Sequence, residues 1–195
     1  MVGSFFKPFK NIIIFLIILT FFICTFFIPT IQADFINGIV GEKITISSLG
    51  FAWPIPGYNV ITSYFGKRNS PTAGASSYHK GLDIGAPEGT ILIAAVDGEI
   101  TYLGFLGGGG YTITLTSNNM KITYCHVSPN FVVQVGQNVK RGEIIGMVGP
   151  KYVYGVQGNT YHDSSGKPTN GATTGCHLHF GIRVDGEYVN PLNYY

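Results

Sequence analysis

Glycine is concentrated in one part of this 195-residue chain, and its distribution limits the folds open to the chain. Residues 34–195 hold 26 of the 27 glycines, about 16% of that segment against an average usage of ~7%. Between them lie short runs of β-branched and aromatic residues, each of the usual strand length. No window after residue 51 shows the 3.6-residue apolar period of a helix. We therefore predict an all-β domain of antiparallel strands joined by tight turns.

The predicted strands follow one another along the second half of the chain. They are expected at Thr90–Ala95, Glu99–Leu103, Tyr111–Thr116, Lys121–His126, Phe131–Val135, Glu143–Val148, His177–Val184 and the chain end. Asp97-Gly98 and Asp185-Gly186 are dipeptides typical of hairpin turns. The four glycines Gly107–Gly110 lack the strand-to-helix context of a phosphate loop and favour a flexible hairpin. Pro150–Thr174 shows no strand pattern, and a loop of that length is usually functional or disordered.

The N-terminal end has a different character. Ile12–Ile28 is almost entirely Ile, Leu and Phe, and is long enough to cross about 30 Å of hydrocarbon. Lys7 and Lys10 precede it, which favours a cytoplasmic N-terminus and export of the remainder. Ala33 suits a signal-peptidase site but Ile31 does not, so a cleaved signal peptide and an uncleaved membrane anchor are both open.

These features divide the chain into three parts. We expect a signal peptide or signal-anchor segment at 1–33, a linker at 34–50 and one domain at 51–195. The whole chain has 12 basic and 10 acidic residues, but residues 34–195 have 10 of each. The net charge of +2 therefore comes from the two lysines of the first segment. No clustered Lys/Arg surface of the kind that tracks phosphates is visible, which argues against nucleic-acid binding.

Histidine and aspartate form the most informative groups. His79 and Asp83 are separated by three residues, and His177 and His179 flank a leucine. Residues i and i+2 of a strand share a face, so His177 and His179 are expected to project together while the leucine packs on the other side. His126 follows a cysteine at the end of a predicted strand.

This residue set suits zinc, which binds neutral imidazole and carboxylate. A catalytic zinc site keeps three protein ligands and one open position, whereas a structural site usually has four ligands that include cysteines. Spacing leaves open which histidines bind metal. A mixed site with Cys125 or Cys176 is also open, as is a Cys125–Cys176 disulfide, which needs Cα atoms within ~7 Å. In a regular strand each cysteine should point away from the histidine that follows it.

The motifs around these residues resemble the lysostaphin-type (LytM-like) zinc metallo-endopeptidases that cut peptidoglycan. The resemblance covers roughly Trp53 to Leu192. It is carried, in order, by Ile61–Arg68, His79–Thr90, Ala94–Ile100, Tyr124–Ser128, Val135–Gly146 and His177–Phe180. Two departures are small: Val127 stands where leucine is common, and Cys176 where proline is common.

The resemblance implies roles that spacing could not give. It implies that His79, Asp83 and His179 hold one Zn²⁺, while His126 and His177 move protons beside the open position. The expected activity is exported, zinc-dependent hydrolysis of peptide bonds in peptidoglycan stem peptides or cross-bridges. The alternative is a non-catalytic member of the fold that regulates cell-wall enzymes or belongs to a membrane-spanning assembly.

The resemblance also implies that residues 150–174 wall one side of a substrate groove. Four residues of this loop could contact peptide or order the loop: Tyr152, Tyr154, Asn159 and Tyr161. We interpret His162 as an exposed loop histidine outside the site, and we assign Arg68 a structural role.

Overall fold

A computed structural model describes residues 44–195, which form twelve strands and two short 3₁₀ helices. The predicted all-β fold is confirmed: this described part contains no α-helix. Nor does any helix in residues 44–195 have the length and apolar character to cross a membrane. The predictions for residues 1–33, and for most of the linker at 34–50, lie outside the described residues.

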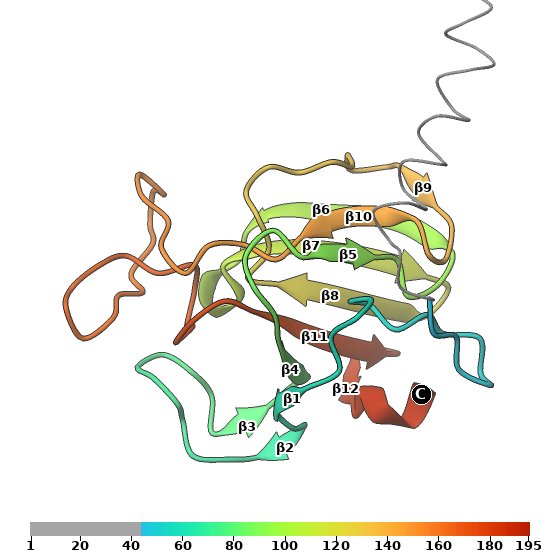
Figure 1. The fold of residues 1–195 in the computed structure, drawn as a ribbon, viewed down its shortest axis with the longest axis horizontal. Helices are drawn as coiled ribbons and strands as arrows, with labels where there is room; N and C mark the ends of the chain where they lie inside the picture. Colours follow the sequence, from blue (N-terminus) through green and yellow to red (C-terminus); the bar gives the residue numbers. More distant parts are fainter. Residues whose placement is uncertain (1–43) are drawn as a thin grey trace, which may run out of the picture. The chain divides into compact units, whose positions relative to one another are not determined.

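The main sheet is antiparallel at every recorded pairing, and its neighbouring strands lie side by side in Figure 1. Its strand order is β1-β4-β11-β8-β7-β6-β9, and β12 also pairs with β11. The strands are β1 (Ile61–Ser63), β4 (Leu82–Gly85), β6 (Gly98–Phe105), β7 (Tyr111–Ser117), β8 (Met120–Cys125), β9 (Asn138–Val139), β11 (His177–Val184) and β12 (Glu187–Val189).

Two small two-stranded sheets complete the fold. One pairs β5 (Ile91–Ile93) with β10 (Ile144–Met147), and the other pairs β2 (Gly66–Lys67) with β3 (Tyr78–His79). Side chains of β5 and β10 share one buried apolar cluster with those of the main sheet. The packing is close, since a Cβ added at Gly146 would lie 2.7 Å from Cδ1 of Ile113 on β7. Burial of this cluster is the main favourable term for folding.

Most predicted strands are present, but three expectations are wrong. Phe131–Val135 is not a strand: Phe131 and Val133 pack against the core while Val132 and Val135 are exposed, but the run pairs with no neighbouring strand. Asp97-Gly98 is not a hairpin turn, because β5 pairs with β10 while β6 belongs to the main sheet. The chain end is not a strand beyond β12. Pro191, which cannot donate to a sheet, begins the 3₁₀ helix Pro191–Tyr194 instead.

The turn and loop predictions fare better. Asp185 and Gly186 have φ values of 51° and 90° and join β11 to β12, as a primed hairpin turn requires. Gly107–Gly109 forms a 3₁₀ turn that joins β6 to β7. Residues 150–174 contain no named strand, and Figure 1 shows this loop extending away from the sheet.

Candidate active site

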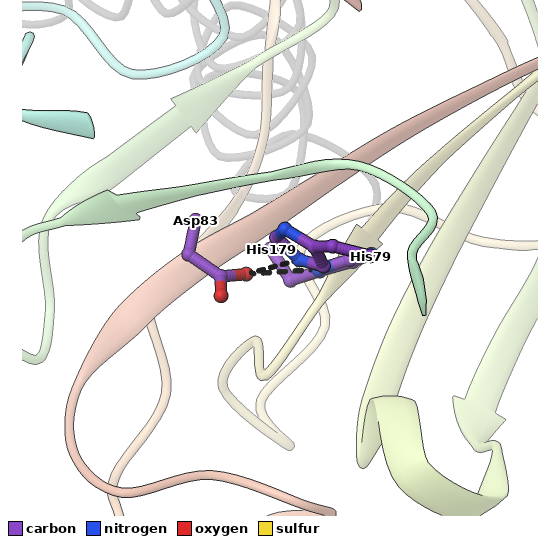
Figure 2. Close-up of side chains that lie close together, drawn as sticks. All are labelled: His79, Asp83 and His179. Atoms are coloured by element: carbon purple, nitrogen blue, oxygen red, sulfur yellow. Dashed lines mark hydrogen bonds and ion pairs between the residues drawn. The ribbon is translucent and has the colours of Figure 1, made fainter. Parts of the chain in front are cut away.

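Strand pairing brings three predicted ligands together. Asp83 on β4 is the register partner of His179 on β11, and His79 ends β3 just before β4. Oδ1 of Asp83 lies 2.9 Å from Nδ1 of His179 and 3.0 Å from Nε2 of His79. The two ring nitrogens are 2.9 Å apart. Figure 2 shows the Asp83 carboxylate directed at both rings. The three donor atoms thus converge on one point, as metal ligands do.

The hydrogen bonds of His79 indicate what belongs between these atoms. Its Nδ1 lies 2.9 Å from the carbonyl oxygen of Tyr64, so that nitrogen donates its proton there. Nε2 of the neutral ring is then a bare acceptor that faces another acceptor, Oδ1 of Asp83, at 3.0 Å. A cation resolves this clash of lone pairs. Two imidazoles and one carboxylate are a donor set suited to zinc, with one position left open. His79 is 2% exposed, which keeps competing water from that ligand.

Arg68 holds the second oxygen of Asp83. Its Nη1 donates to Oδ2 of Asp83 at 2.9 Å and to Oγ of Ser63 at 2.6 Å. A hydrogen-bond partner of this kind orients a ligand carboxylate and tunes its basicity. This contact agrees with the structural role assigned to Arg68: its guanidinium orients a candidate metal ligand, Asp83.

His126 and His177 lie together beside the cluster, with ring centroids 4.6 Å apart. Nε2 of His177 is 3.5 Å from Oδ1 of Asp83, so this ring faces the cluster. His126 follows the end of β8 with a φ of 60°, a left-handed conformation that is uncommon outside glycine. This break in the strand re-aims the His126 side chain. The predicted alternation of neighbouring side chains fails here for that reason.

Backbone carbonyls fix the tautomers of both rings. Nδ1 of His126 is 2.7 Å from the carbonyl oxygen of Asn170, and Nδ1 of His177 is 2.9 Å from that of Gly175. Each Nδ1 therefore donates a proton to the backbone. In the neutral rings, Nε2 of both histidines is left with a lone pair that can accept a proton.

Asn170 connects the long loop to this pair. It is fully buried, and each of its polar groups has a partner. Its Oδ1 accepts from the backbone N–H of Tyr111, and its Nδ2 donates to the carbonyl of Val127. Its own N–H donates to the carbonyl of Lys151. Gly110 has to be glycine at this packing distance, since a Cβ there would meet the Asn170 carbonyl oxygen.

Burial and charge set the protonation of the site. Burial lowers the pKa of His126 to about 3, assisted by the neighbouring His177 and His179, so His126 is neutral at pH 7. Burial also lowers the pKa of His179, despite the adjacent carboxylate. Burial alone would raise the pKa of Asp83, but the close approach of the His177, His179 and His79 rings outweighs it and holds that pKa well below its usual range. The site therefore pairs an ionised carboxylate with the neutral rings of His126 and His179, and neutral imidazole is the form that binds metal.

These residues line one side of an open groove of about 750 Å³. The β6–β7 turn contributes Gly108 and Gly109, the end of the long loop contributes Ala172 and Thr174, and Gly175 and Cys176 follow directly after it. The aromatic residues proposed to contact peptide do not line the groove, nor does His162, which is exposed as expected. Asn159 orders the loop through a hydrogen bond from its Nδ2 to the carbonyl of Thr169.

Cys125 and Cys176 are both free thiols, so the disulfide alternative is not realised. Cys125 on β8 is the register partner of His179 on β11. Cys176 lies just before the start of β11, so it has no register partner opposite Cys125. Burial raises the pKa of the Cys125 thiol to about 11. In residues 44–195, the group with converging donor atoms contains no cysteine. Both cysteines nevertheless line the groove with their neighbouring histidines, contrary to the expected alternation.

Known proteins share sequence with the part of the chain that carries these residues. A family model described as Peptidase family M23 matches residues 77–191. The DD-carboxypeptidase/endopeptidase Mpg of Neisseria meningitidis is 34% identical over 137 residues, which is 70% of this chain and 27% of Mpg. The murein hydrolase activator NlpD of Escherichia coli is 34% identical over 126 residues, 63% of this chain and 28% of NlpD. The chain thus spans about a quarter of the length of these relatives.

Solved structures show the same fold. The catalytic domain of lysostaphin from Staphylococcus simulans is 28% identical with a TM-score of 0.55, over 70% of this chain and 91% of that domain. A zinc-containing peptidase from Vibrio cholerae is 26% identical with a TM-score of 0.55, over 75% of this chain and 44% of that protein. The family match covers more than half of the chain and includes every candidate site residue. The chain therefore belongs to peptidase family M23.

Proposed function

We propose that this protein is an exported zinc endopeptidase that hydrolyses peptide bonds in peptidoglycan stem peptides or cross-bridges. One observation carries the proposal: three converging metal-ligand atoms stand beside two histidines whose Nε2 atoms are free to accept protons. A binding module would need the groove but would have no use for that proton chemistry. The family membership and the name of Mpg support the substrate class.

His79, Asp83 and His179 would hold the zinc through Nε2, Oδ1 and Nδ1. Zinc bound there would polarise the scissile carbonyl and make water more acidic at neutral pH. Nε2 of His126 or of His177 accepts the proton of the attacking water and later passes it to the leaving amine. The protonated imidazole also donates a hydrogen bond to the negative charge that develops on the carbonyl oxygen.

Export rests on the first segment of the sequence. The apolar run Ile12–Ile28 and the two preceding lysines favour transfer of the remaining chain across the membrane. Peptidoglycan lies on that side, so location and substrate agree.

The test uses the full chain and purified peptidoglycan. Mass spectrometry of the released peptides identifies the bond that is cut. Chelation of the metal should abolish release, and one equivalent of Zn²⁺ should restore it. Absence of release by the zinc-loaded protein, together with stimulation of a separate cell-wall hydrolase, would support the non-catalytic alternative instead.

A further inference from the structure

The groove does not end at the metal cluster. His179, Gly181 and Arg183 alternate along β11 and so share the face that carries the cluster. Arg183 is four residues beyond His179, about 13 Å along a strand at roughly 3.3 Å per residue. Thr123, Arg183 and Tyr188 line the groove together with the histidines. The groove thus has a second end, remote from the cluster.

Two cations contact the same aromatic ring at this second end. Cζ of Arg183 lies 4.7 Å from the centre of the Tyr188 ring, and Nζ of Lys80 lies 4.8 Å from the same centre. Tyr188 on β12 is the register partner of Arg183, which fixes the ring beside the guanidinium. Within residues 44–195, no carboxylate forms an ion pair with either cation. Two positive charges on one aromatic ring, with no carboxylate paired to either, favour a bound anion.

Arg183 also has an unmet hydrogen-bond donor. Its Nε is buried and has no partner in the described part of the chain. A buried donor without a partner costs free energy, and most buried polar atoms of folded proteins avoid it. Arg68, the other arginine of the groove, differs because Asp83 and Ser63 already take its Nη1 protons. No hydrogen bond or ion pair within residues 44–195 engages the Arg183 guanidinium, and since its Nε is buried, its Nη groups are the donors left for a ligand.

We propose that Lys80, Arg183 and Tyr188 form a subsite for a carboxylate of the peptide substrate. A guanidinium binds a carboxylate with two parallel N–H donors, and the Tyr188 ring holds it in place while Lys80 adds a second charge. The separation from the cluster corresponds to about four residues of extended peptide. The subsite would thus select peptides that carry a free carboxylate about that far from the scissile bond. This inference rests on the proposed function, and it names the chemical feature by which the groove orients its substrate.

Binding tests the subsite separately from catalysis. The full-length, zinc-loaded His177→Ala variant serves as the background, so that the peptide is not cleaved during calorimetry. The ligands are a stem peptide with free carboxylates and the same peptide with every carboxylate amidated. We expect the free acid to bind about tenfold more tightly than the amide. Peptides amidated at one position at a time then show which carboxylate occupies the subsite.

Substitutions assign the preference to Arg183. Arg183→Met should weaken binding of the acid about tenfold and leave binding of the amide unchanged, and Arg183→Lys should recover part of the loss. Lys67→Gln is the matched control, since it removes one exposed positive charge outside the groove lining and should change neither affinity. Circular dichroism checks that each variant is folded.

The outcomes separate the two proposals. Equal affinity for acid and amide overturns the subsite, as does an equal loss for both peptides in Arg183→Met, which marks a structural role. Acid-selective binding in the background variant, without peptide hydrolysis by the unsubstituted protein, would retain the subsite and overturn the proposed peptidase activity.

Discussion

The metal-ligand cluster and the histidine pair lie side by side but are held by different means. His179 and Asp83 are opposite each other in a strand ladder, so sheet register fixes their separation. His126 and His177 instead depend on the carbonyls of Asn170, near the end of the long loop, and Gly175, directly after it. Register sets where the metal would bind, whereas the loop sets which nitrogen of each ring is free. We call the cluster and the pair the two halves of the site. Substitutions in the first half should affect zinc binding, and substitutions in the second should affect proton transfer.

The largest expected effects come from removing one residue of each half. Asp83→Ala should abolish both zinc retention and hydrolysis, because it removes the one anionic ligand and leaves Arg68 without its carboxylate. His126→Ala should abolish hydrolysis while zinc stays bound. His126 is not one of the three candidate ligands, and its Nδ1 is hydrogen-bonded to the Asn170 carbonyl. Metal analysis and peptide release measured on the same preparations check both expectations.

The same comparison extends to His179→Ala and His177→Ala on a single strand. The first should lose zinc and hydrolysis, and the second should lose hydrolysis alone. Wild-type hydrolysis by the Asp83 variant, or loss of zinc from the His126 variant, would contradict the division into two halves.

A smaller effect is expected at Asn170. Asn170→Ala removes both side-chain hydrogen bonds that hold the carbonyl partner of His126. We expect hydrolysis to fall about tenfold or more with zinc retained, and the free energy of unfolding to fall by about 1–3 kcal/mol from the unpaired buried groups. The imidazole nitrogen resonances of His126 report the tautomer directly, and they should show loss of the single Nδ1–H form.

Asn159→Ala is the matched control in the same loop. Asn159 also anchors the loop by its side chain, but its hydrogen bonds are with Thr169 and Tyr161 and not with His126 or its carbonyl partner. If both asparagine variants reduce hydrolysis equally and leave the His126 resonances alike, the loop acts through its general order and Asn170 has no special position.

The two halves also differ in how far the sequence predicts them. Strand periodicity predicted that His177 and His179 share a face with the leucine between them in the core, and Leu178 is indeed fully buried. The family motif grouped the five residues. No periodic signal marked Asn170, because its importance comes from contacts with Tyr111 and Val127, which are far away in the sequence.

The left-handed backbone at His126 escaped prediction for a related reason. A φ above zero is usually read from glycine or asparagine, and here a histidine adopts it at a strand end held by tertiary contacts. The N–H of His126 donates to Gly109 and its carbonyl accepts from Gly149, so residues from two other segments stabilise the conformation. Local propensity carries no information about such contacts.

Within the ligand half, Arg68 should have an intermediate effect. Arg68→Gln removes the charged donor to Oδ2 of Asp83 while keeping a polar side chain of similar length. We expect zinc affinity to fall about tenfold, because partners behind a ligand typically contribute 10–100-fold. Hydrolysis at saturating zinc should change less. Competition with a chelator of known affinity measures the shift, and an unchanged zinc affinity would place Arg68 outside the metal centre.

The smallest effect is expected at the far end of the loop, where Asp163 organises a turn. Its carboxylate accepts hydrogen bonds from the Ser165 hydroxyl, the Tyr152 hydroxyl and the backbone N–H groups of Ser165 and Lys167, and these bonds lower its pKa. Because the folded-state pKa lies below the unfolded value near 3.9, this stabilisation is present at neutral pH and is lost as the pH falls below about 4.

Asp163→Asn therefore tests whether the whole loop or only its end near the groove supports the histidine pair. The substitution weakens the turn, so amide exchange should quicken between residues 159 and 169 at pH 7, and the difference from the unsubstituted protein should shrink in acid. Zinc content and hydrolysis should stay unchanged, since none of these residues lines the groove. If hydrolysis falls together with the amide-exchange protection of the turn, the position of Asn170 depends on the structure of the entire loop. If protection falls alone, the contacts of Asn170 with the sheet are sufficient to hold His126.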